Sequence, residues 1–89
     1  MKLCKVIGNV WSTKKDSALE GVKLMVVRPV HASGDLQQCY VAADFVGAGI
    51  GEIVLVASGS SARHASHNPA APIDAAIIGI VDAEEIATE

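Results

Sequence analysis

Two histidines at an H-x-x-H spacing, His64 and His67, come nearest to a chemical site in this chain. Zinc sites need three or four well-placed ligands, and no thiolate or carboxylate stands at ligand spacing from this pair. Ser60 and Ser61 offer a nucleophile, but neither lies in a G-x-S-x-G elbow and no carboxylate is placed to orient the histidine. The pattern favours solvated histidines and helix-capping serines, with a small metal-dependent enzyme as a minor alternative.

A second candidate is the glycine-rich segment G-A-G-I-G-E, which runs from Gly47 to Glu52. Glycine-rich loops bind phosphates when a strand precedes them and a helix follows, but here the strand-like run 52–57 follows. We therefore expect a conformational role. The three alternating glycines, Gly47, Gly49 and Gly51, would permit positive φ and close backbone approach in a connection packed against another chain.

The charged residues that remain do not form a catalytic pair. Asp44, Glu52, Asp74 and Asp82 fall at the ends of strand-like runs, where carboxylates end strand pairing or accept backbone hydrogen bonds. None is placed as a general acid and base. Arg63 either pairs with a carboxylate across a subunit contact, which we favour, or is solvated. The sequence predicts no catalytic, metal or cofactor residues.

The overall charge and aromatic content argue against a nucleic-acid partner. The 89 residues carry a net charge of −3 and have three aromatic side chains, Trp11, Tyr40 and Phe45. A monomeric OB-fold module for single-stranded nucleic acid needs a basic groove and stacking aromatics, and the chain supplies neither. This module stays the alternative from another functional class.

The N-terminal stretch and the two cysteines bear on the compartment. Lys5 and Asn9 interrupt the apolar residues after Lys2, and no small-residue cleavage site follows. We expect neither a signal peptide nor a membrane span. Cys4 and Cys39 lie in strand-like runs, which predicts reduced core thiols in the cytoplasm.

The elements that must position these residues are predicted to be strands. Val, Ile, Leu and Ala supply most of the 51% apolar residues, which favours strands. We expect an all-β fold: one domain over residues 1–89, forming a small five-stranded barrel with a short helix or turn, 60–65, before the last strand. A hairpin turn at Ser33, Gly34 and Asp35 should make the second and third strands antiparallel. Pro69 and Pro72 should then impose an extended crossing. The five predicted strands are residues 3–12, 24–28, 38–45, 52–57 and 75–82.

Several of these runs show almost no polar alternation. A barrel strand with water outside should alternate, because successive side chains point to opposite faces. The runs 24–27, 53–57 and 75–81 are nearly all apolar, so both faces should be covered. With no spare helix to cover the outer face, we expect neighbouring subunits to cover it. A compact monomer with Ala and Val on its surface is the alternative.

The same segments, in this order, resemble the EutN/CcmL family of bacterial microcompartment vertex proteins. The resemblance extends over nearly the whole chain, and no single motif carries it alone. The matching segments are K-V-I-G-N-V (5–10), L-E-G-V-K-L (19–24), V-G-A-G-I-G-E (46–52), V-L-V-A-S-G-S-S-A-R (54–63) and N-P-A-A-P-I-D-A-A-I-I-G-I-V-D (68–82).

This resemblance implies an OB-like barrel that assembles as a homopentamer and closes the corners of a microcompartment shell in the bacterial cytoplasm. It implies a structural protein without a cofactor, whose partners are hexameric shell proteins. His64 and His67 depart from the family pattern, and Trp11 stands where a smaller apolar residue is usual. The residues that it implies at subunit contacts or the central opening are Gly47, Gly49, Gly51, Ser60, Ser61, Arg63 and Asn68.

Overall fold

The computed structural model describes residues 1–12, 14–31 and 38–82. Each of the five predicted runs is a strand, and its ends differ from the prediction by at most two residues. The short helix predicted before the last strand is also present. In chain order the elements are β1 (Lys2–Val10), the 3₁₀ helix η1 (Ser17–Leu19), β2 (Lys23–Pro29), β3 (Tyr40–Asp44), β4 (Ile53–Ser58), α1 (Ser60–Ala65) and β5 (Ala75–Val81).

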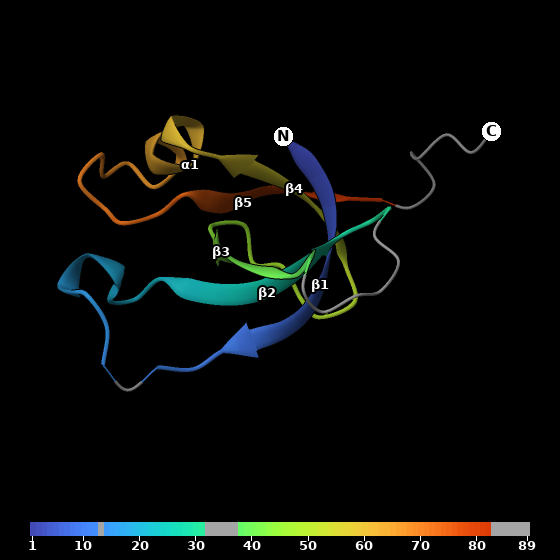
Figure 1. Cartoon of the computed structure of the whole chain (residues 1–89), viewed down its shortest axis with the longest axis horizontal. Helices are drawn as coiled ribbons and strands as arrows, with labels where there is room; N and C mark the ends of the chain where they lie inside the picture. Colours follow the sequence, from blue (N-terminus) through green and yellow to red (C-terminus); the bar gives the residue numbers. More distant parts are fainter. Residues whose placement is uncertain (13, 32–37, 83–89) are drawn as a thin grey trace.

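The strands close into a barrel in the order β1-β2-β3-β5-β4, and β4 pairs back to β1 (Figure 1). All neighbouring pairs are antiparallel except β3 and β5, which are parallel. The predicted antiparallel pairing of β2 and β3 is confirmed, while Ser33, Gly34 and Asp35 lie outside the described residues. The expected small five-stranded barrel is therefore confirmed.

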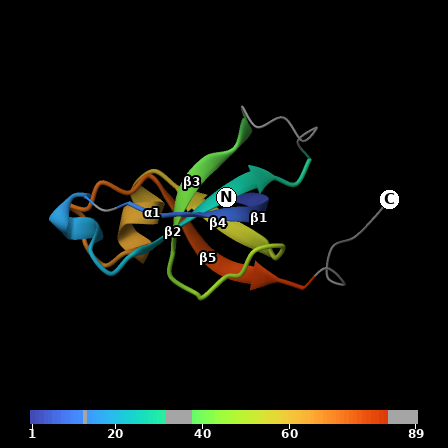
Figure 2. The ribbon, with the colours of Figure 1, turned by 90° about the horizontal axis from the view of Figure 1, so that it is seen from below.

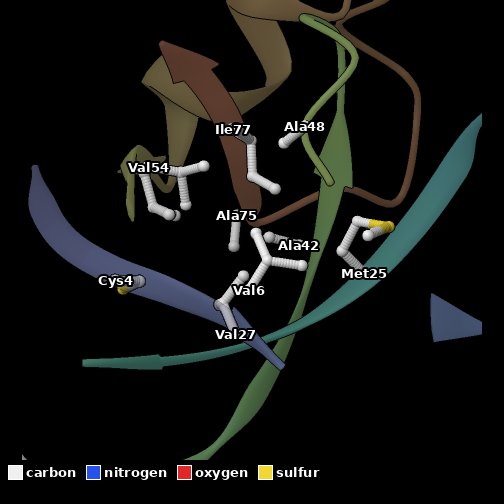
Figure 3. Close-up of a cluster of buried hydrophobic side chains, with 10 residues drawn as sticks. Cys4, Val6, Met25, Val27, Ala42, Ala48, Val54, Ala75 and Ile77 are labelled. Atoms are coloured by element: carbon white, nitrogen blue, oxygen red, sulfur yellow. The ribbon is translucent and has the colours of Figure 1, made fainter. Parts of the chain in front are cut away.

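Alternate side chains of the strands fill the barrel (Figure 3). Val6, Val27, Val54 and Ile77 are fully buried there, one from each of four strands. Met25 packs among them and is the largest fully buried side chain of the described residues. Because the valine and isoleucine side chains are compact and branched, they fit the narrow interior of a five-stranded barrel.

A second buried cluster covers part of the outer face, which corrects one expectation. Ala43 of β3 and Ala76 of β5 pack there against Ala62 of α1 and Ile73. Leu19, from η1, packs against the same cluster. Figure 2 shows α1 and η1 at the same end of the molecule. The chain's own segments α1 and η1 thus cover part of an outer face that we expected another subunit to cover. The small alanine side chains let these segments approach the strands closely.

Two local predictions after β4 are wrong. Gly59, rather than Ser60 or Ser61, is the N-cap residue of α1, and no side chain caps the helix. The segment after α1 is not simply extended, because Ala71 N–H donates to Asn68 O at 3.0 Å and closes a turn. Proline permits this turn, since the N–H that Pro69 lacks is not used in it.

Both cysteines are free, but the prediction of core thiols is confirmed for Cys4 and wrong for Cys39. Cys4 lies in the barrel core, whereas Cys39 is half-buried just before β3. In the described part of the chain, no helix is long and apolar enough to cross a membrane.

Candidate functional site

The carboxylate of Asp44 organises the glycine loop, residues 45–52, between β3 and β4. Its Oδ1 accepts hydrogen bonds from Val46 N–H at 3.0 Å and Gly47 N–H at 3.1 Å. Its Oδ2 accepts from Ala48 N–H at 2.8 Å. The Asp44 side chain is 1% exposed, so three charge-assisted hydrogen bonds hold the first half of the loop in a dry environment.

Lys23, on the neighbouring strand β2, completes this arrangement. Its Nζ lies 3.8 Å from Asp44 Oδ2 and donates to Ala48 O at 3.1 Å. The side chain of Lys23 is 53% exposed, so its ion pair with Asp44 is partly screened by water. The backbone N–H groups are therefore the principal partners of the carboxylate.

Core packing and backbone hydrogen bonds also attach the glycine loop to the barrel. Ala48 is fully buried and its side chain points into the core beside Ile77 (Figure 3). Gly51 N–H donates to Val6 O at 2.8 Å, and Val6 N–H donates to Glu52 O at 3.0 Å. The loop is thus attached to β1 by two backbone hydrogen bonds and packs Ala48 into the core.

The predicted positive φ is confirmed at two of the three glycines. Gly47 has φ of 79° and Gly51 has φ of 95°, values that favour glycine strongly. Gly49 does not have positive φ, which corrects the expectation for that residue. Its N–H donates to Glu52 Oε1 at 2.6 Å, and a Cβ at Gly49 would lie 3.3 Å from that oxygen. The constraint at Gly49 is thus a close side-chain approach.

The fastened loop presents apolar side chains to the outside. Ile50 is 62% exposed, and Phe45 and Val46 are also exposed. Because the backbone beneath these three residues is fixed by Asp44 and Val6, they form a preformed apolar edge at the end of the barrel.

Ser60, Ser61, Arg63 and Asn68 form a separate group around α1. The two serines are exposed in the first turn of the helix, and Arg63 is half-buried in its last turn. Asn68 Oδ1 accepts from Ala70 N–H at 3.1 Å, so this side chain stabilises the turn after the helix.

The structure does not bring the two groups of predicted contact residues together. The glycine loop precedes β4 and α1 follows it, so they lie at opposite ends of the same strand (Figure 1). A six-residue strand spans roughly 20 Å at about 3.3 Å per residue. One subunit therefore has two separate candidate surfaces.

The histidine pair does not form a metal centre in the part of the chain that the structure describes. His64 and His67 line a surface hollow of about 270 Å³ with Arg63, Asn68 and Pro69. No group of three or more His, Cys, Asp and Glu side chains able to hold a metal was found among residues 1–12, 14–31 and 38–82. The hollow offers too few ligands for the zinc chemistry considered above.

Tyr40 occupies a site that sequence reasoning missed. Its Oη forms a hydrogen bond of 3.2 Å with Cys4 Sγ, and Lys2 Nζ lies 5.9 Å from the centre of its ring. Burial, and then the hydrogen bond with Cys4, raise the pKa of Tyr40 well above its ordinary value. No local signal predicts this contact, because 36 residues separate Cys4 and Tyr40. The role of Asp44 did have a signal: a carboxylate at a strand end followed by glycine three residues later.

The chain matches a protein-family model described as ethanolamine utilisation protein EutN/carboxysome over residues 1–82. The shell vertex protein PduN of Salmonella typhimurium is 49% identical over 87 residues, covering 92% of this chain and 96% of the relative. The carboxysome shell vertex protein CcmL of Synechococcus elongatus is 48% identical over 83 residues, covering 92% and 84%.

Solved structures of microcompartment shell proteins have the same fold as this chain. The pentameric microcompartment shell protein GrpN from Rhodospirillum rubrum has a TM-score of 0.80 at 48% identity, covering 98% of this chain and all of that one. A pentameric shell protein from the RMM microcompartment has a TM-score of 0.83 at 34% identity, covering 100% and 99%. These findings do not favour the nucleic-acid module or the small enzyme. The chain belongs to the EutN/CcmL family of structural microcompartment shell vertex proteins.

Proposed function

We propose that five copies of this chain close into a ring that fills a five-fold vertex of a microcompartment shell in the bacterial cytoplasm. The observation that carries the proposal is the match, over nearly the whole chain, to vertex proteins and to two pentameric shell structures. A flat hexagonal sheet cannot close on itself, and five-fold units introduce the curvature that closes it. A ring of identical heterologous contacts supplies this symmetry.

The partners in the shell are hexameric shell proteins that tile the facets around each pentamer. The support for this part is geometric, because a five-fold unit can occupy a corner only where hexagonal units surround it. The subunit acts by shape, so its surfaces rather than any catalytic group determine its function.

Within the ring, the two groups of contact residues lie at or near the subunit contacts and the central opening. The glycine loop, with Gly47, Gly49 and Gly51, supports this assignment because it presents a fixed apolar edge. Ser60, Ser61, Arg63 and Asn68 support it less directly, because they are exposed or half-buried and polar. The strand that separates the groups is roughly 20 Å long, which suits a subunit that meets one neighbour on each side.

Light scattering coupled to size exclusion tests the ring. Five chains of 9.2 kDa give about 46 kDa, and this mass is expected at micromolar subunit concentration. A mass of 9.2 kDa would contradict the proposal. Co-expression with hexameric shell proteins tests the vertex role: shells should close with the chain and stay open or elongated without it.

An arginine substitution in the glycine loop tests the contact assignment. Ile50→Arg places a charge at a side chain that is 62% exposed, so the subunit should fold while the ring dissociates. Lys5→Glu, a charge reversal at an exposed residue of β1 outside both groups of contact residues, is the control and should stay pentameric. A pentameric Ile50→Arg variant would place the glycine loop away from the contact.

A further inference from the structure

The barrel is closed between β3 and β5 by only a short stretch of pairing. In the described chain these strands pair only at Ala43 with Ala76 and at Asp44 with Ile77. The first half of β3, Tyr40–Ala42, pairs with β2 on its other side but has no ladder partner toward β5. A hollow of about 490 Å³, here called the seam slot, opens at this place. It is lined by Lys2, Tyr40, Val41, Val56, Ser58, Asp74 and Ala75.

The seam slot is suited to a large side chain that has both apolar and polar atoms, because Val41 lies on its wall beside Lys2 and Asp74. Val41 on its wall is 45% exposed, although it is a strand residue. A smaller hollow of about 190 Å³ shares Val41, Asp74 and Ala75 with the slot and extends it toward Leu19. The volume falls in the range of pockets that accept a drug-sized ligand, so an indole ring fits.

Trp11 is the most exposed large apolar side chain of the described residues. It follows the last residue of β1 and is 91% exposed. Tryptophan is highly buried on average, and burying one removes about 150–250 Å² of surface from water. In the single chain, Trp11 stays in water and contributes no burial of this kind. Its exposure therefore points to a partner that covers it.

Trp11 does not reach the seam slot of its own chain. Lys2, on the slot wall, is the first residue of β1, and Trp11 comes just after its last residue. A nine-residue strand spans up to about 30 Å, and Figure 1 shows the two ends of β1 on opposite sides of the molecule. The exposed Trp11 side chain and the seam slot thus lie on two different surfaces of one subunit.

A ring with one repeated contact requires two such surfaces. In a heterologous contact, one patch of each subunit meets a different patch of the next, whereas a two-fold contact uses the same patch twice. Resting on the pentamer proposed above, we propose that Trp11 of each subunit inserts into the seam slot of its neighbour and anchors the ring.

The charges around the two surfaces are compatible with this contact. Lys15 lines the hollow next to Trp11, and Asp74 is exposed at the rim of the seam slot. Asp16, beside Lys15, and Lys2 of the slot offer a second pair of opposite sign. Rim charges of this kind orient two partners more than they add to affinity.

The intrinsic fluorescence of the protein tests the proposal, because Trp11 is the single tryptophan of the chain. In the wild-type pentamer, the emission should be blue-shifted and protected from iodide quenching. In Val41→Arg, which blocks the slot, the emission should shift to the red and quenching should rise several-fold. The control Lys5→Glu, a charge reversal at an exposed residue of β1 that lines neither the seam slot nor the hollow next to Trp11, should behave as wild type. Equal quenching in the wild-type pentamer and in Val41→Arg would overturn the proposal.

The assembly mass gives an independent test. Trp11→Ser should fall from about 46 kDa to 9.2 kDa with unchanged circular dichroism, and Trp11→Phe should stay largely pentameric. A Trp11→Ser variant that remains at 46 kDa would overturn the Trp11 contact and leave the proposed function standing. A wild-type protein of 9.2 kDa would instead refute the pentamer itself.

Mixing the two defective variants tests the direction of the contact. Trp11→Ser keeps an intact slot and Val41→Arg keeps an intact Trp11, so one productive contact can form between them. Two chains of 9.2 kDa, about 18 kDa, are expected for the mixture, with no ring. A mixture that remains at 9.2 kDa would show that Trp11 and the slot do not meet.

Discussion

Replacing Asp44 by alanine should destabilise the subunit more than removing its ion pair with Lys23. The substitution removes the acceptor of three backbone N–H groups, those of Val46, Gly47 and Ala48. Val46 and Gly47 are exposed, so water can replace the carboxylate there, but Ala48 is fully buried. An unsatisfied buried donor costs about 1–3 kcal/mol, and with the two weakened bonds the loss comes to about 3 kcal/mol.

Two further variants separate the carboxylate from its ion pair. Asp44→Asn keeps one acceptor oxygen, which can face Ala48 N–H, and turns an amide N–H₂ toward the other two donors. The loss should be about half as large, roughly 1.5 kcal/mol. Lys23→Gln removes the ion pair but leaves all three hydrogen bonds. Because Lys23 is 53% exposed, its loss should be below about 1 kcal/mol.

Urea unfolding of the three variants measures these differences. The subunit concentration must be the same throughout, because the stability of an assembly depends on it. Hydrogen exchange gives a local reading: the protection of the Ala48 amide should be lost in Asp44→Ala and kept in Lys23→Gln. An Asp44→Ala loss no larger than that of Lys23→Gln would refute the reasoning that the backbone donors, rather than Lys23, define the role of Asp44.

Three further predictions concern backbone strain, titration and capping. Gly51→Ala should cost about 1–2 kcal/mol in urea unfolding, because alanine is strained at φ of 95°, whereas Gly49→Ala should cost less. Folding favours the neutral form of Tyr40 and raises its pKa. The stabilisation from this residue is therefore complete below about pH 10 and is lost as the pH rises through the pKa of Tyr40 in the folded protein. Phenolate absorbance of this single tyrosine should therefore appear at higher pH in native than in urea-unfolded protein; coincident titrations would contradict this. Ser60→Ala should change the unfolding free energy by less than about 0.5 kcal/mol, because no serine caps α1, and a larger loss would contradict that assignment.

The strands could be predicted because their signals are local. Runs of Val and Ile such as β4, ended by Gly59 on one side and the glycine loop on the other, show both the element and its limits. Pairing, register and the parallel contact of β3 with β5 depend on residues far apart in the chain, and composition carries no such information. The coverage of β5 by α1 was missed for the same reason.

The predictions for the candidate site were also partly right and partly wrong. Gly47 and Gly51 were predicted to have positive φ because glycine alone adopts it easily, but the alternating pattern extended this wrongly to Gly49. The wrong cap at Ser60 has a comparable cause. Serine is a common N-cap residue, yet Gly59 takes that position with φ of 61°, a conformation unsuited to serine.

The arrangement around Asp44 also bears on how the ring would form. Because Asp44 and Val6 hold the glycine loop within the single subunit, little conformational entropy remains to be lost there on association. Trp11, by contrast, lies at the end of β1 and is 91% exposed, so its rotamers must be fixed on binding. A change at Asp44 should therefore lower the stability of the subunit first and the ring only as a consequence. A change at Trp11 should leave the subunit intact and act on the ring alone, so each surface affects a different measurable step.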